Sequence, residues 1–169
     1  GTMGNGIAQA CAVAGLNAVM QDISDAALER GMKTLGGSLD RLVKKGSLTE
    51  AGRAEVLARV RTTRDPAELA VADLVIEAAT ENPAIKVEIL RKVDAIAKPE
   101  AVIASNTSSI SITRLAAVTD RPERFIGMHF MNPVPAMKLV EIIRGIATEE
   151  DTYQSVKAVV EKLGKISVT

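Results

Sequence analysis

Short runs of β-branched and aliphatic residues alternate with segments of helical pattern along the 169 residues of the chain. The clearest run, Ala-Asp-Leu-Val-Ile-Glu-Ala-Ala at 72–79, is apolar almost without interruption. Such a run is typical of a parallel strand that is covered on both faces. Strands that alternate with helices predict an α/β fold, with a doubly wound, mostly parallel sheet and helices on both of its faces.

The predicted elements cover most of the chain. Strands are predicted at 17–22, 59–63, 72–79, 101–105, 124–130, 138–144 and 165–169. Helices are predicted at 1–14, 25–45, 50–58, 83–97, 112–118 and 148–162, with a short helix that opens at Asp65-Pro66. Side-chain oxygens that can accept a hydrogen bond from a first helical turn mark the predicted N-caps, which are Ser24, Thr49, Asn82 and Ser111. Gly15 is predicted to end the first helix in a left-handed cap, and Gly46 to stop the second.

The charge balance excludes some classes of partner. Lys plus Arg and Asp plus Glu are equal at 21 each, so no global field attracts nucleic acid or an anionic membrane. No apolar stretch reaches membrane-spanning length, and no segment resembles a signal peptide. The single Cys11 cannot form an internal disulfide and is expected to be a small buried helix residue. We therefore expect a cytoplasmic protein that binds neither nucleic acid nor membranes, and no metal site is predicted.

Glycine-rich and polar segments come where strands are predicted to end. The glycine turn at 1–6, Asp22 and the segments 77–81 and 105–108 are all expected to follow strands, and so is His129. In doubly wound sheets, ligands bind beyond the carboxyl ends of the strands. We therefore expect these groups to converge on one edge of the sheet and to form a single site.

The first six residues, Gly-Thr-Met-Gly-Asn-Gly, match the back half of a dinucleotide-binding fingerprint. Gly1 would let the backbone approach a pyrophosphate, and Gly4 would let the helix pack closely on a strand. The amides at the helix start would donate hydrogen bonds to the phosphates. The leading glycine of the fingerprint and the first strand of the fold are missing from the given chain. Because glycine-rich turns are common, an ordinary turn is the alternative.

Asp22 strengthens the dinucleotide hypothesis. It ends the next predicted strand, about 20 residues after the glycine turn, where an acidic side chain accepts hydrogen bonds from the ribose of NAD. Residues 23–25 include no arginine that could hold a 2′-phosphate, so we predict NAD rather than NADP as the cofactor. The alternative is an aspartate that only caps a helix.

His129 is the only histidine of the chain. Glu141 follows it twelve positions later, and Asn132 lies between them. Imidazole transfers protons near neutral pH, and a carboxylate partner fixes its tautomer and supports its charged form. We therefore predict that His129 is a general acid/base. A structural histidine is the alternative, since single histidines in globular domains are often structural.

Two further polar segments are candidates for ligand binding. The segment 105–113 holds more hydroxyls and amides than turns and caps require, so Asn106 and Ser108 are predicted to bind a ligand. The segment 76–82 places two carboxylates at a strand end, where an exposed loop is the alternative. Lys86, one turn into the next helix, either reaches a cofactor ribose or faces solvent.

A basic helix face is predicted at 38–46, where Arg41, Lys44 and Lys45 gather. A solvated helix surface explains this pattern without any ligand. The alternative is a clamp for a phosphate-bearing tail, in which each lysine acts as a point charge.

Taken together, five segments closely resemble the NAD-binding domain of the (S)-3-hydroxyacyl-CoA dehydrogenases, and most of all its short-chain bacterial members. They are GTMGNGIAQACA, DIS, VIEAATEN, ASNTSSISIT and RFIGMHFMNPVPAMKLVEIIRG. The resemblance spans nearly the whole chain, in the same order and spacing. It implies a Rossmann-like domain over 1–169, with a helical CoA-binding excursion at about 24–58. It also implies the NAD-dependent interconversion of (S)-3-hydroxyacyl-CoA and 3-oxoacyl-CoA, for a short acyl chain such as that of 3-hydroxybutyryl-CoA and acetoacetyl-CoA.

The resemblance implies a role for individual residues. His129 would take the proton of the 3-hydroxyl, Glu141 would orient the imidazole, and Ser108 and Asn132 would hydrogen-bond the substrate oxygens. The positions that match the cofactor side of the family's site are Gly1, Thr2, Met3, Gly4, Asp22, Glu81, Lys86 and Asn106. Ser38 and Lys45 match its CoA-binding helix.

The family's second domain, which is helical, closes the acyl-CoA cleft and forms a homodimer, would follow Thr169 and is absent from the given chain. We therefore expect a homodimer only in the full-length protein. Two other hypotheses remain open. The first is a non-catalytic or truncated NAD-binding fragment, and the second is a dehydrogenase of a free hydroxy acid on the same fold.

Overall fold

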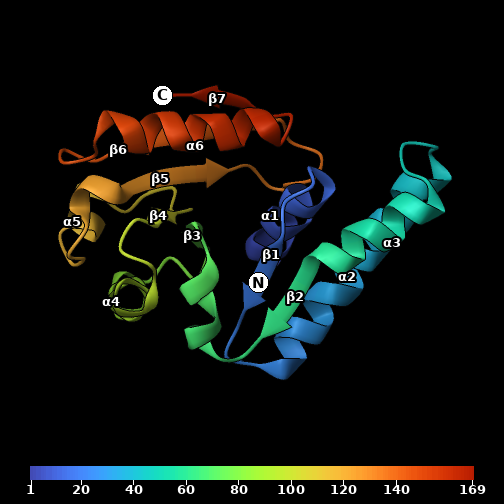
Figure 1. Ribbon diagram of the computed structural model, residues 1–169, viewed down its shortest axis with the longest axis horizontal. Coiled ribbons are helices and arrows are strands. Elements are labelled where there is room, and N and C mark those ends of the chain that lie inside the picture. The colour runs from blue at the N-terminus through green and yellow to red at the C-terminus, as the bar shows by residue number, and fades with distance from the viewer.

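The computed structural model describes residues 1–169 and contains two sheets (Figure 1). In the smaller sheet, β1 (Ala18–Gln21) pairs with β2 (Val60–Thr63). The larger sheet has the order β3 (Leu74–Glu77), β4 (Val102–Ser105), β5 (Phe125–Phe130), β6 (Leu139–Arg144) and β7 (Ile166–Val168). Every pairing is parallel except that of β5 with β6.

The predicted fold class is confirmed, with one difference in the sheet. One continuous sheet is predicted, whereas β1 and β3 are not hydrogen-bonded to each other. No strand of residues 1–169 lies between them.

The helices follow the predicted alternation. They are α1 (Thr2–Val13), α2 (Asp25–Lys44), α3 (Glu50–Arg59), α4 (Pro83–Ile96), α5 (Ile112–Ala116) and α6 (Glu150–Lys162). Two short 3₁₀ helices are η1 (Pro66–Val71) and η2 (Pro122–Arg124). Helix α5 ends two residues earlier than predicted. None of the helices is both long and apolar enough to span a membrane.

The predicted caps are confirmed. At each of the N-caps Ser24, Thr49, Asn82 and Ser111, the side chain accepts a hydrogen bond from a backbone N–H of the first turn. Gly15 and Gly46 follow α1 and α2 with φ of 94° and 77°, a left-handed conformation that costs other residues a steric clash. The local chemistry of the sequence therefore determines where these helices begin and end.

Helices cover both faces of the five-stranded sheet. On one face, α1 and α6 pack against β4, β5 and β6 around Ile126, Met128 and Val140. On the other face, α4 and α5 pack around Ile103 and Phe125. Helices α2 and α3 lie beyond β2, away from the larger sheet (Figure 1), and share a small core with α1.

Candidate active site

His129 and Glu141 face each other across neighbouring strands. The antiparallel register of β5 and β6 pairs residue 129 with residue 141, so both side chains lie on the same face of the sheet. Nδ1 of His129 lies 3.8 Å from Oε1 of Glu141, which is an ion-pair distance rather than a hydrogen bond. The side chain of His129 is 22% exposed and that of Glu141 is 48% exposed. The fold therefore brings the predicted proton-transfer group and its acidic partner together.

The position of His129 differs from the prediction in one respect. His129 lies inside β5, one residue before its end, which agrees with the strand predicted at 124–130 but not with the expectation that His129 follows the strand. The pairing of β5 with β6 continues through Phe130 and Val140, so hydrogen bonds hold the backbone on both sides of the imidazole.

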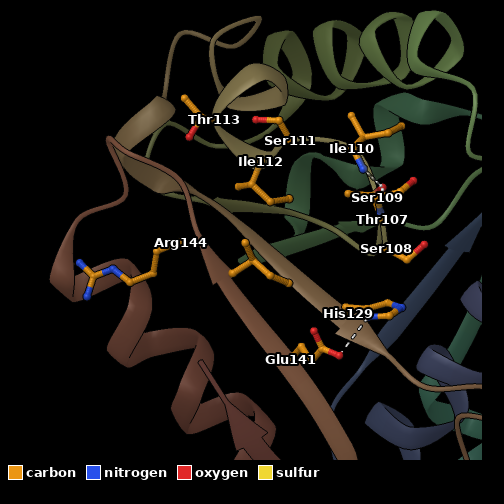
Figure 2. A pocket seen from close by; sticks show the side chains of 11 residues that line it. Thr107, Ser108, Ser109, Ile110, Ser111, Ile112, Thr113, His129, Glu141 and Arg144 are labelled. Carbon is orange, nitrogen blue, oxygen red and sulfur yellow. Dashed lines mark hydrogen bonds and ion pairs between the residues drawn. The ribbon is translucent and has the colours of Figure 1, made fainter.

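A cavity of about 300 Å³ opens beside this pair (Figure 2). Its walls come from the end of β4 through α5 and from β5 and β6, and they consist of residues 107–113, His129, Glu141, Ile143 and Arg144. In Figure 2, His129 and Glu141 lie at one end, with Ser108 and Ser109 on the side facing the imidazole. A cavity of this size can take a small organic group. The predicted Ser108 thus lines the same cavity as His129.

Glu81 binds the hydroxyl loop, which we define as residues 106–111. Its Oε2 accepts hydrogen bonds from Thr107 Oγ1 at 2.9 Å and Ser109 Oγ at 3.0 Å, and from the N–H and Oγ of Ser108, both at 3.3 Å. Desolvation acts to raise the pKa of Glu81. Hydrogen bonds from Thr107, Ser109 and Lys86, with the charge of Lys86, outweigh it and lower that pKa to about 2.

The two asparagines of the site have different surroundings. Oδ1 of Asn106 accepts a hydrogen bond from the Phe130 N–H at 2.8 Å, which ties the end of β4 to the residue after His129. Asn132 is exposed in the turn that joins β5 to β6. Roles of Asn106 toward a cofactor and of Asn132 toward a substrate stay predictions.

Lys86 does not face solvent, so that alternative is wrong. Its side chain is 1% exposed and forms an ion pair of 2.7 Å with Glu77, which is 1% exposed as well. Glu77 is one of the two carboxylates predicted at this strand end, where an exposed loop is the alternative, and its burial shows that it does not belong to an exposed loop. Its pairing with Lys86 was not predicted, because glutamate and lysine are usually solvated. The predicted contact of Lys86 with a cofactor ribose stays a prediction.

The start of α1 fits a dinucleotide. Its N-cap, Gly1, offers no side-chain acceptor, and the first turn holds no acidic residue, so the amides of Thr2, Met3 and Gly4 lack a side-chain partner. A Cβ added at Gly1 would meet nothing within 4 Å, so this residue borders open space. The Oδ2 of Asp22 lies 3.7 Å from the nitrogen of Gly1. Free amides at a helix start suit a pyrophosphate, and a nearby carboxylate suits ribose hydroxyls.

A second, open cavity of about 480 Å³ lies next to Asp22. Gln21, Ile23, Arg64, Asp65 and Pro66 line it, from the ends of β1 and β2. Ile23 is 85% exposed, which is unusual for an isoleucine. Sequence reasoning missed Arg64 and Pro66, because only the pairing of β1 with β2 brings them beside Asp22.

The two predicted CoA-side residues lie on α2 and at its end, in different surroundings. The Oγ of Ser38 accepts a hydrogen bond from Nε2 of Gln9 on α1 at 2.8 Å. Lys45 is the exposed C-cap of α2 and lies beside the exposed Lys44. A basic surface is therefore present at the end of α2, and its role toward a phosphate-bearing tail stays a prediction.

Comparison with known proteins gives a consistent result. The family described as "3-hydroxyacyl-CoA dehydrogenase, NAD binding domain" matches residues 1–169. The "3-hydroxybutyryl-CoA dehydrogenase" of Bradyrhizobium diazoefficiens is 53% identical over 165 residues, which are 98% of this chain and 56% of that protein. The "fatty acid oxidation complex subunit alpha" of Psychrobacter cryohalolentis is 44% identical over 99% of this chain and 23% of its own length.

The crystal structure of the (S)-3-hydroxybutyryl-CoA dehydrogenase PaaH1 from Ralstonia eutropha has the same fold. Its TM-score to this chain is 0.98 at 59% sequence identity, and the match covers all of this chain and 60% of that one. The chain thus spans 56% of the length of the Bradyrhizobium protein and 60% of the Ralstonia one.

Proposed function

The chain belongs to the 3-hydroxyacyl-CoA dehydrogenase family and comprises its NAD-binding domain, and on this premise we propose that the whole protein interconverts (S)-3-hydroxyacyl-CoA and 3-oxoacyl-CoA. The acyl chain is short, as in 3-hydroxybutyryl-CoA and acetoacetyl-CoA. The observation that carries the proposal is the facing pair of His129 and Glu141 at the end of a cavity that also holds Ser108.

Proton transfer at the 3-oxygen is the task of His129. Its Nδ1 is directed toward Glu141, which leaves Nε2 to exchange a proton with the substrate. In the direction of oxidation, the imidazole takes the proton of the 3-hydroxyl, and the carboxylate of Glu141 stabilises the resulting imidazolium. NAD, when bound, supplies the acceptor for the hydride that leaves C3.

Ser108 and Asn132 orient the substrate in this proposal. Ser108 lies in the cavity wall facing the imidazole, and Asn132 lies in the turn just beyond β5. A hydroxyl and a side-chain amide can each donate a hydrogen bond to the 3-oxygen or the thioester oxygen. Such contacts hold C3 near the nicotinamide ring and lower the entropic part of the barrier.

The proposal also includes a binding surface for the CoA portion of the substrate and a homodimer of the whole protein. The exposed Lys44 and Lys45 at the end of α2 are suited to the phosphates of a CoA tail. The Bradyrhizobium and Ralstonia relatives are longer than this chain, and we propose that the further part of the whole protein forms a homodimer. Light scattering of the full-length protein tests this assembly, and a monomer would contradict it.

The activity is tested with the full-length protein, acetoacetyl-CoA and NADH, followed by NADH absorbance. We expect turnover of the thioester and little turnover of free acetoacetate, because the free acid lacks the CoA tail. Replacing His129 with Gln is expected to lower kcat by about 100- to 10,000-fold, the usual contribution of general acid–base catalysis. NADH affinity should change little, because His129 does not lie at the start of α1. Equal turnover of the free acid, or unchanged kcat in His129→Gln, would contradict the proposal.

A further inference from the structure

A pair of opposite charges is fully buried behind the hydroxyl loop. Glu77 ends β3 and Lys86 lies one turn into α4, and each side chain is 1% exposed. Desolvation of both charges offsets most of their attraction, so a buried ion pair often stabilises a fold no better than an apolar pair would. The position of the pair therefore calls for a reason other than stability.

Each polar atom of the pair has a partner in the protein. Nζ of Lys86 contacts Glu77 Oε2 at 2.7 Å, the carbonyl of Ala79 at 3.2 Å and Glu81 Oε1 at 3.3 Å, which accounts for its three protons. The other oxygen of Glu77 accepts a hydrogen bond from Ser105 Oγ at 2.6 Å. Glu77 thus joins the end of β3 to α4 and to the end of β4.

The chain of contacts leads from this pair into the cavity. Lys86 holds one oxygen of Glu81, and the other oxygen of Glu81 accepts hydrogen bonds from the loop that includes Ser108. Ser105, which Glu77 holds, accepts a hydrogen bond from the Thr107 N–H at 3.3 Å. Two routes therefore connect Glu77 to the loop that faces His129.

We propose that Glu77 is a positioning residue of the active site, which acts through Lys86, Glu81 and Ser105 to fix the hydroxyl loop and so the place of Ser108 opposite His129. This proposal rests on the proposed dehydrogenase function for its kinetic consequence. Glu77 itself touches neither substrate nor cofactor, because its side chain is buried and both of its oxygens are bound within the protein.

The test compares three variants with the wild-type full-length protein. Glu77→Gln keeps the shape of the side chain but takes away the buried anion of Lys86, so that the part-exposed Glu81 is the remaining acidic partner of the ammonium. Glu77→Gln combined with Lys86→Met removes the ammonium as well. Asp94→Asn is the matched control, because Asp94 forms a similar ion pair of 2.7 Å with Arg121, with side chains 10% and 9% exposed, further along the same α4.

Three quantities are measured for each protein. They are kcat and KM with acetoacetyl-CoA and NADH, the midpoint of thermal unfolding, and the hydrogen-exchange protection of the Ser108 and Ser109 amides. Glu77→Gln should lower kcat by about 10- to 100-fold, with a smaller change of KM, because a small displacement of a positioning group costs about this much. The Ser108 amide should lose protection. Asp94→Asn should lower the unfolding midpoint and leave kcat and the loop amides unchanged.

The double variant separates positioning from mere stability. Removing the buried ammonium should restore much of the unfolding midpoint, yet kcat should stay low, because Glu81 then lacks the cation that holds it. Recovery of kcat together with stability would overturn the proposal, and so would an effect of Glu77→Gln that matches the control. If the wild-type protein does not reduce acetoacetyl-CoA, the proposed function is wrong. The hydrogen exchange of the Ser108 amide then still tests whether Glu77 fixes the hydroxyl loop.

Discussion

At the scale of single residues, Glu81 carries a charge that the fold favours. Three hydroxyls, a backbone N–H and the ammonium of Lys86 surround its carboxylate, and its pKa falls from 4.5 to about 2. A carboxyl whose pKa is lower in the folded state stabilises that state fully above pH 4.5. The contribution disappears as the pH falls through about 2, where the folded carboxylate is protonated too.

This linkage predicts the behaviour of Glu81→Gln. The variant should be less stable than the wild type at pH 7, and the difference should shrink steadily below pH 4.5 and vanish near pH 2. Urea unfolding of both proteins at several pH values measures the difference in their free energies of unfolding. A difference that does not change with pH would show that the charge of Glu81 contributes nothing.

The pKa of Cys11 shifts upward, in the opposite direction to that of Glu81. Burial raises the pKa of its thiol from 9.0 to about 11, because the thiolate is poorly solvated inside the protein. Only the thiolate reacts readily with alkylating reagents. Iodoacetamide at pH 8 should therefore modify Cys11 slowly in the folded protein and rapidly in urea, as mass spectrometry would reveal. Equal rates in both conditions would contradict the burial of this thiol.

At the scale of elements, α1 and the turn that joins β5 to β6 approach each other at Gly6. A Cβ added there would lie 2.7 Å from Cβ of the buried Val134, closer than two such atoms can come. On its other side, the turn is held by Lys165, whose Nζ donates to the carbonyls of Val134 and Met137 at 2.7 and 2.6 Å. The helix that begins at the glycine turn and the hairpin that carries His129 thus share one contact.

Gly6→Ala should therefore destabilise the protein by about 1–3 kcal/mol through overpacking. It should also lower kcat, because the displaced turn carries Asn132 between β5 and β6. The clash involves the Cβ of Val134, so Val134→Gly should relieve it and Val134→Ala should not. Denaturation curves and kinetics of these variants measure both effects.

Gly37→Ala serves as the control for Gly6→Ala. Gly37 lies in the middle of α2, and its added Cβ would meet only the end of the Arg41 side chain at 3.9 Å. This variant should gain about 0.5–1 kcal/mol, since glycine is unfavourable inside a helix. A stability loss like that of Gly6→Ala would mean that close contact with Val134 is not the cause.

The elements also show which parts of the structure the sequence predicts. Helix starts at Ser24, Thr49 and Asn82 depend on local hydrogen bonds, so local sequence suffices to place them. The facing of His129 and Glu141 depends on strand register, and the turn of residues 131–138 is too long for its sequence to fix that register. Burial of Lys86 with Glu77 depends on packing between β3 and α4, and lysine is normally exposed. Local signals therefore predicted the elements, whereas contacts between elements needed the structure.

At the scale of the whole molecule, the apolar cores differ in size. The two cores on the faces of the larger sheet hold 11 and 10 buried residues. The core between α1, α2 and α3 holds only Ala12, Leu35, Leu39 and Val56. Burial of apolar surface is the main stabilising contribution, so the free energy that resists opening should differ between these regions.

Hydrogen exchange tests this difference. The amides of α2 and α3 should exchange faster than those of β4 and β5 under conditions where the protein stays folded. A single uniform rate, equal to that of global unfolding, would show instead that the molecule opens as one unit.

The pairing of residue 129 with residue 141 on one rung of the β5–β6 ladder limits how the gene can change in length. Side chains alternate between the two faces of a strand, so deletion of Ile142 would shift one part of β6 by one residue. Either Glu141 or Ile143 would then point to the face of the sheet that α6 covers. Insertions and deletions in descendants of this gene should therefore collect in the codons for 131–138 and spare those for 139–144.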